Sequence, residues 1–186
     1  MAWIPIEDHD KQKTSAMGYP PVIGATQGGT IDESVELAVM LATKFSGAVY
    51  DARELAFTAI PGLPNWSKGE ATGVHAEVLI IRAWLALILR ASSGGSTSST
   101  GVSTGPSVAD ALASLRGRTI VASQPACWCC AALMKQLGIK FPPEPGTKPL
   151  TGWRHPLAKK TVPNSDLPSS REGVTNSWLD EAALLS

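Results

Sequence analysis

The chain reads His75-Ala76-Glu77, followed by the apolar run Val78-Leu79-Ile80-Ile81-Arg82-Ala83-Trp84-Leu85-Ala86-Leu87-Ile88-Leu89. About fifty residues later it reads Ser123-Gln124-Pro125-Ala126-Cys127-Trp128-Cys129-Cys130. The apolar run predicts a buried helix that His75 and Glu77 open. Cys127 and Cys130 are three residues apart, so a helix that begins near Cys127 places both thiols on one face of its first turn. We therefore expect one helix start to carry the histidine and the carboxylate, and another to carry the cysteines.

These side chains are typical of a metal site. One imidazole (His75) and two thiolates (Cys127 and Cys130) suit a tetrahedral Zn²⁺, and they leave its fourth position for water. The start of a helix favours thiolate, because the unpaired backbone N–H groups and the helix dipole stabilise negative charge there. Zinc lowers the pKa of its water to roughly 7, and Glu77 is then placed to move the proton as the catalytic acid and base. Cys129 points away from Cys127 on such a helix, so we assign it to packing.

Each part of this pattern has an alternative interpretation. A His-x-Glu triplet is common in proteins without any site. A Cys-x-x-Cys pair can be a redox pair, but that motif belongs to a thioredoxin-like fold whose pattern is not found here. A structural zinc site takes four protein ligands, and the other histidines, His9 and His155, do not stand at ligand-like spacings. The combination of motifs therefore favours a catalytic zinc site.

His-x-Glu followed by Pro-Cys-x-x-Cys is the known pattern of zinc deaminases. The chain resembles the cytidine deaminase-like superfamily over roughly residues 32–141. The resemblance rests on the order of expected elements: a helix (32–45), two extended segments (48–54 and 56–60), the His75 helix, a strand (119–122), and the cysteine helix leading to 138–140. The family usually has proline directly before the first cysteine, whereas Ala126 separates Pro125 from Cys127 here. The Ser-x-x-x-Cys-x-x-Cys form is more similar to the deaminase domains of bacterial polymorphic toxins.

The resemblance implies a three-layer α/β/α fold, with a mixed central sheet of about five strands flanked by helices. It implies a Zn²⁺-dependent hydrolytic deaminase that converts cytosine to uracil in nucleic acid, with single-stranded DNA favoured and double-stranded DNA as a further substrate. The alternative is a deaminase of free nucleosides or nucleotides, of cytidine or adenosine type. A toxin-type domain would act as a monomer in the cytoplasm of a target cell and would have a cognate immunity protein as partner. A binding module without activity would not need Glu77.

Composition fits a single domain. The 186 residues are 44% hydrophobic and carry a formal net charge of zero, which is enough apolar material for one core. Three cysteines within four positions cannot form a disulfide framework, so a reducing compartment or metal binding is favoured. The segment Ile6-Glu7-Asp8-His9-Asp10 is not typical of a signal peptide. The apolar run 78–91 is too short for a bilayer and carries Arg82, so we expect a soluble protein without membrane contact.

The rest of the chain is less regular. Residues 1–30 predict an extended lead-in, and residues 92–105, rich in Ser, Gly and Thr, predict a flexible loop. A short helix is expected within 106–115. Residues 142–175 are rich in Pro and Gly and predict an irregular segment, followed by a final helix over 176–185.

Substrate contacts are the least specified part of the prediction. The candidate substrate-binding residues are Asn65, Trp66, Ser123, Trp128, Trp153 and Arg154. Asn65 is proposed by the resemblance, in which an asparagine ahead of the histidine helix contacts sugar or base. Trp153 lies in a basic part of the tail, with Lys148, Arg154, His155, Lys159 and Lys160, which suits phosphate contact and base stacking. Core packing is the alternative for Trp66 and Trp128, and a solvated loop is the alternative for the tail.

Overall fold

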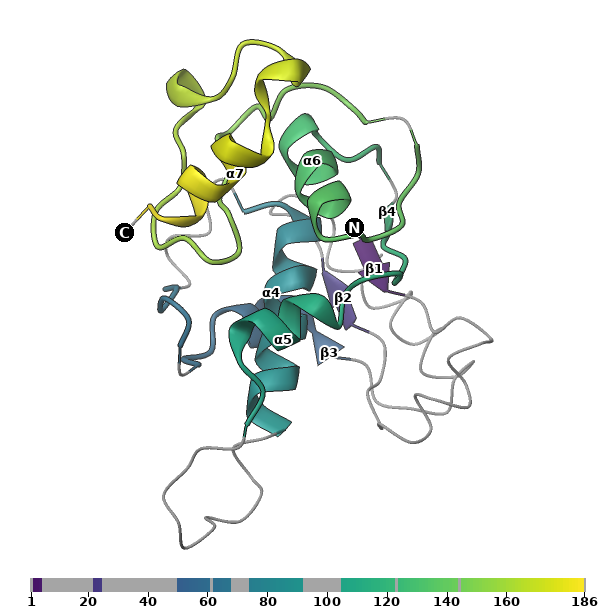
Figure 1. The fold of residues 1–186 in the computed structure, drawn as a ribbon, viewed down its shortest axis with the longest axis vertical. Helices are drawn as coiled ribbons and strands as arrows, with labels where there is room; N and C mark the ends of the chain where they lie inside the picture. Colours follow the sequence, from purple (N-terminus) through teal and green to yellow (C-terminus); the bar gives the residue numbers. More distant parts are fainter. Residues whose placement is uncertain are drawn as a thin grey trace, which may run out of the picture.

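Four short strands form one mixed sheet (Figure 1). The computed structural model describes residues 2–4, 22–24, 50–60, 62–67, 74–91, 105–122, 124–143 and 145–185. The strands are β1 (Ala2–Ile4), β2 (Val22–Gly24), β3 (Tyr50–Asp51) and β4 (Val121–Ala122), in the order β3-β2-β1-β4. β1 is antiparallel to β2 and β4, and β2 is parallel to β3. The three-layer arrangement around about five strands stays a prediction.

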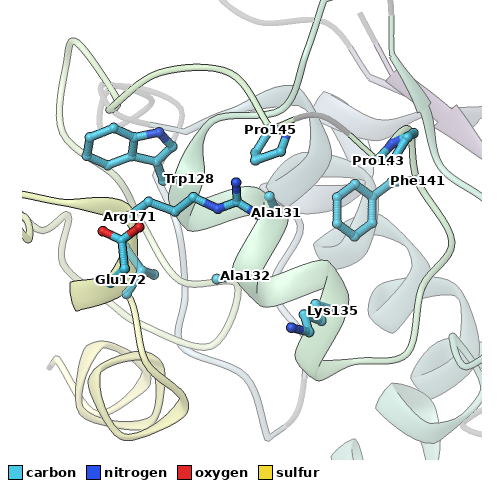
Figure 2. A pocket seen from close by; sticks show the side chains of 10 residues that line it. Trp128, Ala131, Ala132, Lys135, Phe141, Pro143, Pro145, Arg171 and Glu172 are labelled. Atoms are coloured by element: carbon cyan, nitrogen blue, oxygen red, sulfur yellow. The ribbon is translucent and has the colours of Figure 1, made fainter.

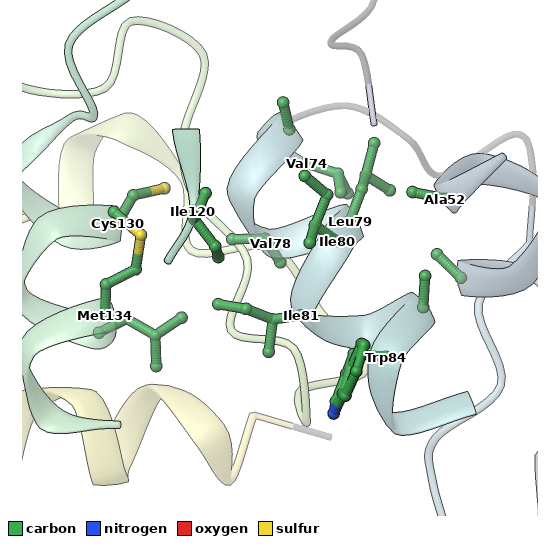
Figure 3. Packing of buried hydrophobic residues seen from close by; sticks show 14 of the residues in the cluster. Ala52, Val74, Val78, Leu79, Ile80, Ile81, Trp84, Ile120, Cys130 and Met134 are labelled. Carbon is green, nitrogen blue, oxygen red and sulfur yellow. The ribbon is translucent and has the colours of Figure 1, made fainter. Parts of the chain in front are cut away.

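Helix α4 (Ala76–Ala91) is the central element of the core. It contacts β1, β2, helix α3 (Ala52–Ala56) and helix α5 (Val108–Ala113). Every side chain from Ala76 to Leu87 is buried, so the helix is covered on all sides, as its apolar sequence predicts. Figure 3 shows Val78 and Ile81 of α4 facing Ile120 and Met134 across the core.

One prediction for residues 48–60 is wrong. The segments 48–54 and 56–60 were expected to be extended, but among the residues described there only Tyr50–Asp51 is a strand, and Ala52–Ala56 is helical. The sequence Ala-Arg-Glu-Leu-Ala consists of strong helix formers. Ala52, Leu55 and Ala56 are buried, which is the helical spacing of one apolar side that packs on α4.

The other helices predicted within the described residues are confirmed. The cysteine helix is α6 (Trp128–Gln136), and it packs against the final helix α7 (Asn176–Ala183). Helix α5 is capped by Ser107 and Asp110, whose side chains bond each other's backbone N–H. The described residues between α6 and α7 form two short 3₁₀ turns, η2 (Asn164–Asp166) and η3 (Arg171–Gly173), and are otherwise without helices or strands. None of the described helices is long and apolar enough to cross a bilayer.

Some predictions lie outside the described residues. These are the helix over 32–45, most of the lead-in 1–30, and the loop 92–105 except for Gly105. The two described parts of the lead-in are extended, as predicted, and they pair with each other as β1 and β2. The predicted strand over 119–122 contains β4, and Thr119 also forms a parallel bridge with Lys140 beyond α6.

Candidate metal centre

Two helix starts carry the candidate ligands, as the sequence predicts. His75 directly precedes α4, and its carbonyl accepts the N–H of Leu79 at 2.9 Å. Cys127 caps the start of α6 with an extended backbone, and its Sγ accepts the N–H of Cys130 at 3.4 Å. Both cysteines therefore belong to the first turn of α6. The helix caps, and not flexible loops, hold these side chains in place.

The donor atoms of His75, Cys127 and Cys130 all lie within 4.8 Å of one another, a separation that one metal ion can span. Cys130 is fully buried, and Cys127 and His75 are half-buried. Cys129 is also buried but is not a member of this group, in agreement with its predicted role in packing. Glu77 is 7% exposed and lies within hydrogen-bonding reach of the Cys130 side chain, so its carboxylate lies beside the donor group without belonging to it.

The side chains in and around the donor group shift one another's pKa values. Hydrogen bonds from the thiols of Cys129 and Cys130, together with the neighbouring His75, hold the pKa of Cys127 far below its ordinary value. Burial lowers the pKa of His75, but the hydrogen bond and charge of Cys127 and the charge of Glu77 outweigh burial, so the net shift is upward. Cys127 is therefore the thiolate of the group, and His75 is drawn toward the imidazolium form beside it.

The pKa values of Cys129, Cys130 and Glu77 are all shifted upward. The hydrogen bond to the Cys127 thiolate, followed by burial, raises the pKa of Cys129. Burial raises the pKa of Cys130, and the charge of Cys127 adds to this effect. Burial likewise raises the pKa of Glu77. Each shift opposes a further negative charge, and a divalent cation among the donors would relieve that opposition.

The donor set fits zinc. One imidazole and two thiolates are a known three-ligand set for catalytic zinc, and the described residues supply three ligands to this group and no fourth. The other ring N–H of a zinc-bound histidine normally donates to a carbonyl or a carboxylate, which fixes the ring. Here the carbonyl of Gly152 accepts a hydrogen bond from the His75 ring. The structure thus supplies both the donor atoms and the partner that orients the imidazole.

The tail contributes a second contact to the donor group. The Nε1–H of Trp153 donates to Sγ of Cys130 at 3.4 Å, and Trp153 is 0% exposed. Its indole packs between the ring of His155 and that of Trp178 on α7, with centroids 5.9 and 5.6 Å away. Two backbone hydrogen bonds with Val162, of 3.0 and 2.7 Å, close the loop that carries Gly152 and Trp153. We call residues 150–162 the tail loop.

Position 152 accepts no residue other than glycine without backbone strain. Its φ is +86°, a conformation that L side chains rarely adopt, and an added Cβ would lie 2.7 Å from the carbonyl oxygen of Val162. Gly152 is not among the site residues that the sequence predicts. A glycine in a segment rich in Gly and Pro has no local pattern that marks it as a partner of a distant histidine.

The structure corrects the predicted roles of Trp153 and Arg154. They were expected to stack a base and contact a phosphate, but Trp153 is fully buried and Arg154 is 3% exposed. The Arg154 guanidinium lies 5.0 Å from the ring centre of Trp66. The tail loop therefore packs behind the donor group instead of presenting these two side chains to solvent.

Trp66 is also a core residue. Its Nε1–H donates to the carbonyl of Ala158 at 2.7 Å, and it is 1% exposed. The guanidinium of Arg82 lies 4.3 Å from its ring centre and donates to the carbonyls of Ala56, Pro64 and Pro156. Burial and the nearby Arg154 lower the pKa of Arg82 to about 10. Arg82 thus joins α4 to the tail loop, and the packing interpretation of Trp66 holds.

The remaining candidate substrate-binding residues differ in how exposed they are. Asn65 is exposed, and Ser123 lies outside the described residues. Trp128 is half-buried, and its side chain lines a groove on the outer side of α6 (Figure 2). Of the basic tail residues, His155 is buried, Lys148 is half-buried, and Lys159 and Lys160 are exposed.

No protein-family model matches this chain, and no curated protein or solved structure matches it at a significant level.

Proposed function

We propose that this chain is a zinc-dependent hydrolytic deaminase that converts cytosine to uracil in nucleic acid, with single-stranded DNA as the favoured substrate. The observation that carries the proposal is the grouping of His75, Cys127 and Cys130 within 4.8 Å, beside the buried carboxylate of Glu77. The preference for cytosine and for nucleic acid comes from the Ser-x-x-x-Cys-x-x-Cys form and its likeness to toxin-type deaminase domains. A structural zinc site is disfavoured, because the described residues give the group three protein ligands and not four.

His75, Cys127 and Cys130 would hold the zinc ion. Bound there, zinc with an open position would acidify water and so make a strong nucleophile available at neutral pH. In the net reaction water adds at C4 of the base, and the C4–N bond to the amino group then breaks to release ammonia. Glu77 takes a proton from the water, passes it to ring nitrogen N3, and transfers the second proton to the departing amine.

The surroundings of Glu77 suit this sequence of proton transfers. Burial raises its pKa from the ordinary value, which brings the carboxyl nearer to the neutral range where one group can both accept and donate. Its position two residues after His75 keeps it at the same helix start as the metal ligand. The carboxylate and the donor group therefore stay in fixed relation without a loop rearrangement.

The test is deep sequencing of single-stranded DNA, double-stranded DNA and RNA after incubation with the purified, zinc-loaded protein, with free cytidine assayed in parallel. C-to-U changes support the proposal, A-to-I changes transfer it to adenine, and turnover of cytidine alone promotes the nucleoside enzyme. We expect Glu77→Ala to retain zinc and fold and to lose at least ~10²–10⁴-fold in activity, because one group serves several proton transfers. Activity within a few-fold of the unchanged protein would refute the mechanism.

A further inference from the structure

Helix α6 has a second side, which lines a groove. Trp128, Ala131, Ala132 and Lys135 follow the i, i+3, i+4, i+7 spacing of one helix face, whereas the two zinc-binding cysteines lie on another. The first face forms the floor of a groove with a volume of about 360 Å³. A neighbouring hollow of about 480 Å³ shares Ala132 and Lys135 with it, so the depression continues along the helix.

The groove combines aromatic and basic side chains. Trp128 and Phe141 are half-buried lining residues, and Lys135 and Arg171 are exposed. Figure 2 shows the Arg171 guanidinium reaching over the groove between Trp128 and Phe141. Glu172 is an acidic residue of the lining, so these three ionisable side chains sum to one positive charge. Aromatic rings with basic side chains are typical of sites that stack bases and contact phosphates along a single strand.

The groove adjoins the start of α6. Trp128 directly follows the ligand Cys127, and its backbone N–H donates to the carbonyl of Thr147 at 3.2 Å. The segment at Gly146 packs closely on the cysteine motif, since the Gly146 N–H donates to the carbonyl of Ala126 at 2.6 Å. A strand lying in the groove would therefore arrive at the start of α6, where Cys127 and Cys130 stand.

We propose that this groove binds the single-stranded polynucleotide segment that flanks the base to be deaminated. Stacking on Trp128 and Phe141 would hold flanking bases, and Lys135 and Arg171 would contact their phosphates. The inference rests on the proposed function, and it assigns strand binding to the groove on α6 and not to the tail loop, where Trp153 and Arg154 are buried.

The experiment measures binding without turnover. Glu77→Ala protein is titrated against fluorescein-labelled 15-mers of dT and of rU, each holding one cytosine, and anisotropy is followed across a salt series. Replacing both Lys135 and Arg171 with Gln should weaken binding and make the logarithmic salt slope shallower by about 1.4, since each phosphate contact on a single strand contributes about 0.7. Trp128→Leu should weaken binding about 5- to 150-fold, the equivalent of ~1–3 kcal/mol per stacked base.

Two matched variants serve as controls. Replacing Lys159 and Lys160 with Gln removes the same charge from the exposed tail and should leave affinity within about twofold. Glu172→Gln removes the opposing charge and should tighten binding. Unchanged affinity in the Lys135/Arg171 variant, at equal zinc content, would overturn the groove assignment even if the protein deaminates cytosine. Failure of all deamination, with the groove effects intact, would instead overturn the proposed function.

Discussion

The two helix starts and the tail loop meet at the same donor group, but they contribute to it in different ways. The helix starts supply the side-chain atoms that could hold a metal ion, and short spacings in the sequence determine which atoms these are. The tail loop supplies the groups that orient those atoms, through the Gly152 carbonyl and the Trp153 indole. Donor atoms thus follow from local geometry, whereas their orientation follows from contacts between distant parts of the chain.

The largest expected effect is on zinc binding, and it distinguishes two neighbouring cysteines at the start of α6. Cys130→Ser should abolish stoichiometric zinc binding, because it removes one of three ligands, whereas Cys129→Ser should retain about one zinc per chain. Metal content is measured by mass spectrometry after gel filtration, and circular dichroism checks that both variants fold. Equal zinc in both variants would mean that Cys129 can replace Cys130 and that the three-residue spacing does not select the ligands.

The next prediction concerns burial of the tail loop. Burial lowers the pKa of His155 from 6.5 to about 4, and the charge of Asp180 opposes this only in part. Because the folded pKa lies below the unfolded one, His155 contributes stability that is complete above about pH 6.5 and is lost as the pH falls toward 4. The difference in pKa corresponds to roughly 3 kcal/mol.

Nuclear magnetic resonance titration of the His155 ring measures this pKa directly. A His155→Gln variant should lose the corresponding acid dependence of its unfolding free energy, when compared with the unchanged protein at equal zinc content. A His155 pKa near 6.5 would indicate a solvated tail, as the basic sequence suggests, and would contradict the packing described here.

A smaller effect tests how the tail loop orients a ligand. Trp153→Phe keeps an aromatic ring against Trp178 but removes the N–H that donates to Cys130. Loss of such an outer partner typically weakens metal affinity 10- to 100-fold. Competition with a zinc chelator measures the affinity. An affinity equal to that of the unchanged protein would show that the contact only fills space.

The sequence predicted the two helix starts that carry the candidate ligands, because the patterns that mark them are local. The run from Val78 to Leu89 predicts a buried helix, and three-residue spacing distinguishes Cys130 from Cys129. The tail was misread at Trp153 and Arg154, because aromatic and basic residues are usual on binding surfaces. Their burial depends on Trp66, Arg82 and α7, which are far away in the chain. Ala52–Ala56 was misassigned for another reason: the order of elements in the resemblance outweighed the helix propensity of the residues themselves.

The smallest expected effect comes from the exposed end of the tail loop. Lys159 and Lys160 are solvent-exposed, and their backbone N–H groups donate to the carbonyl of Leu185 at 2.8 and 3.3 Å. Replacing both with Gln keeps these backbone bonds, so the unfolding free energy should change by no more than ~0.5 kcal/mol, and zinc content should stay the same. Denaturant unfolding and metal analysis measure the two quantities. A loss above 1 kcal/mol would mean that the lysine side chains also support the loop. A salt slope shallower by about 1.4 for oligonucleotide binding would instead mean that the tail contacts phosphates, and strand binding would then belong to the tail and not to the groove on α6.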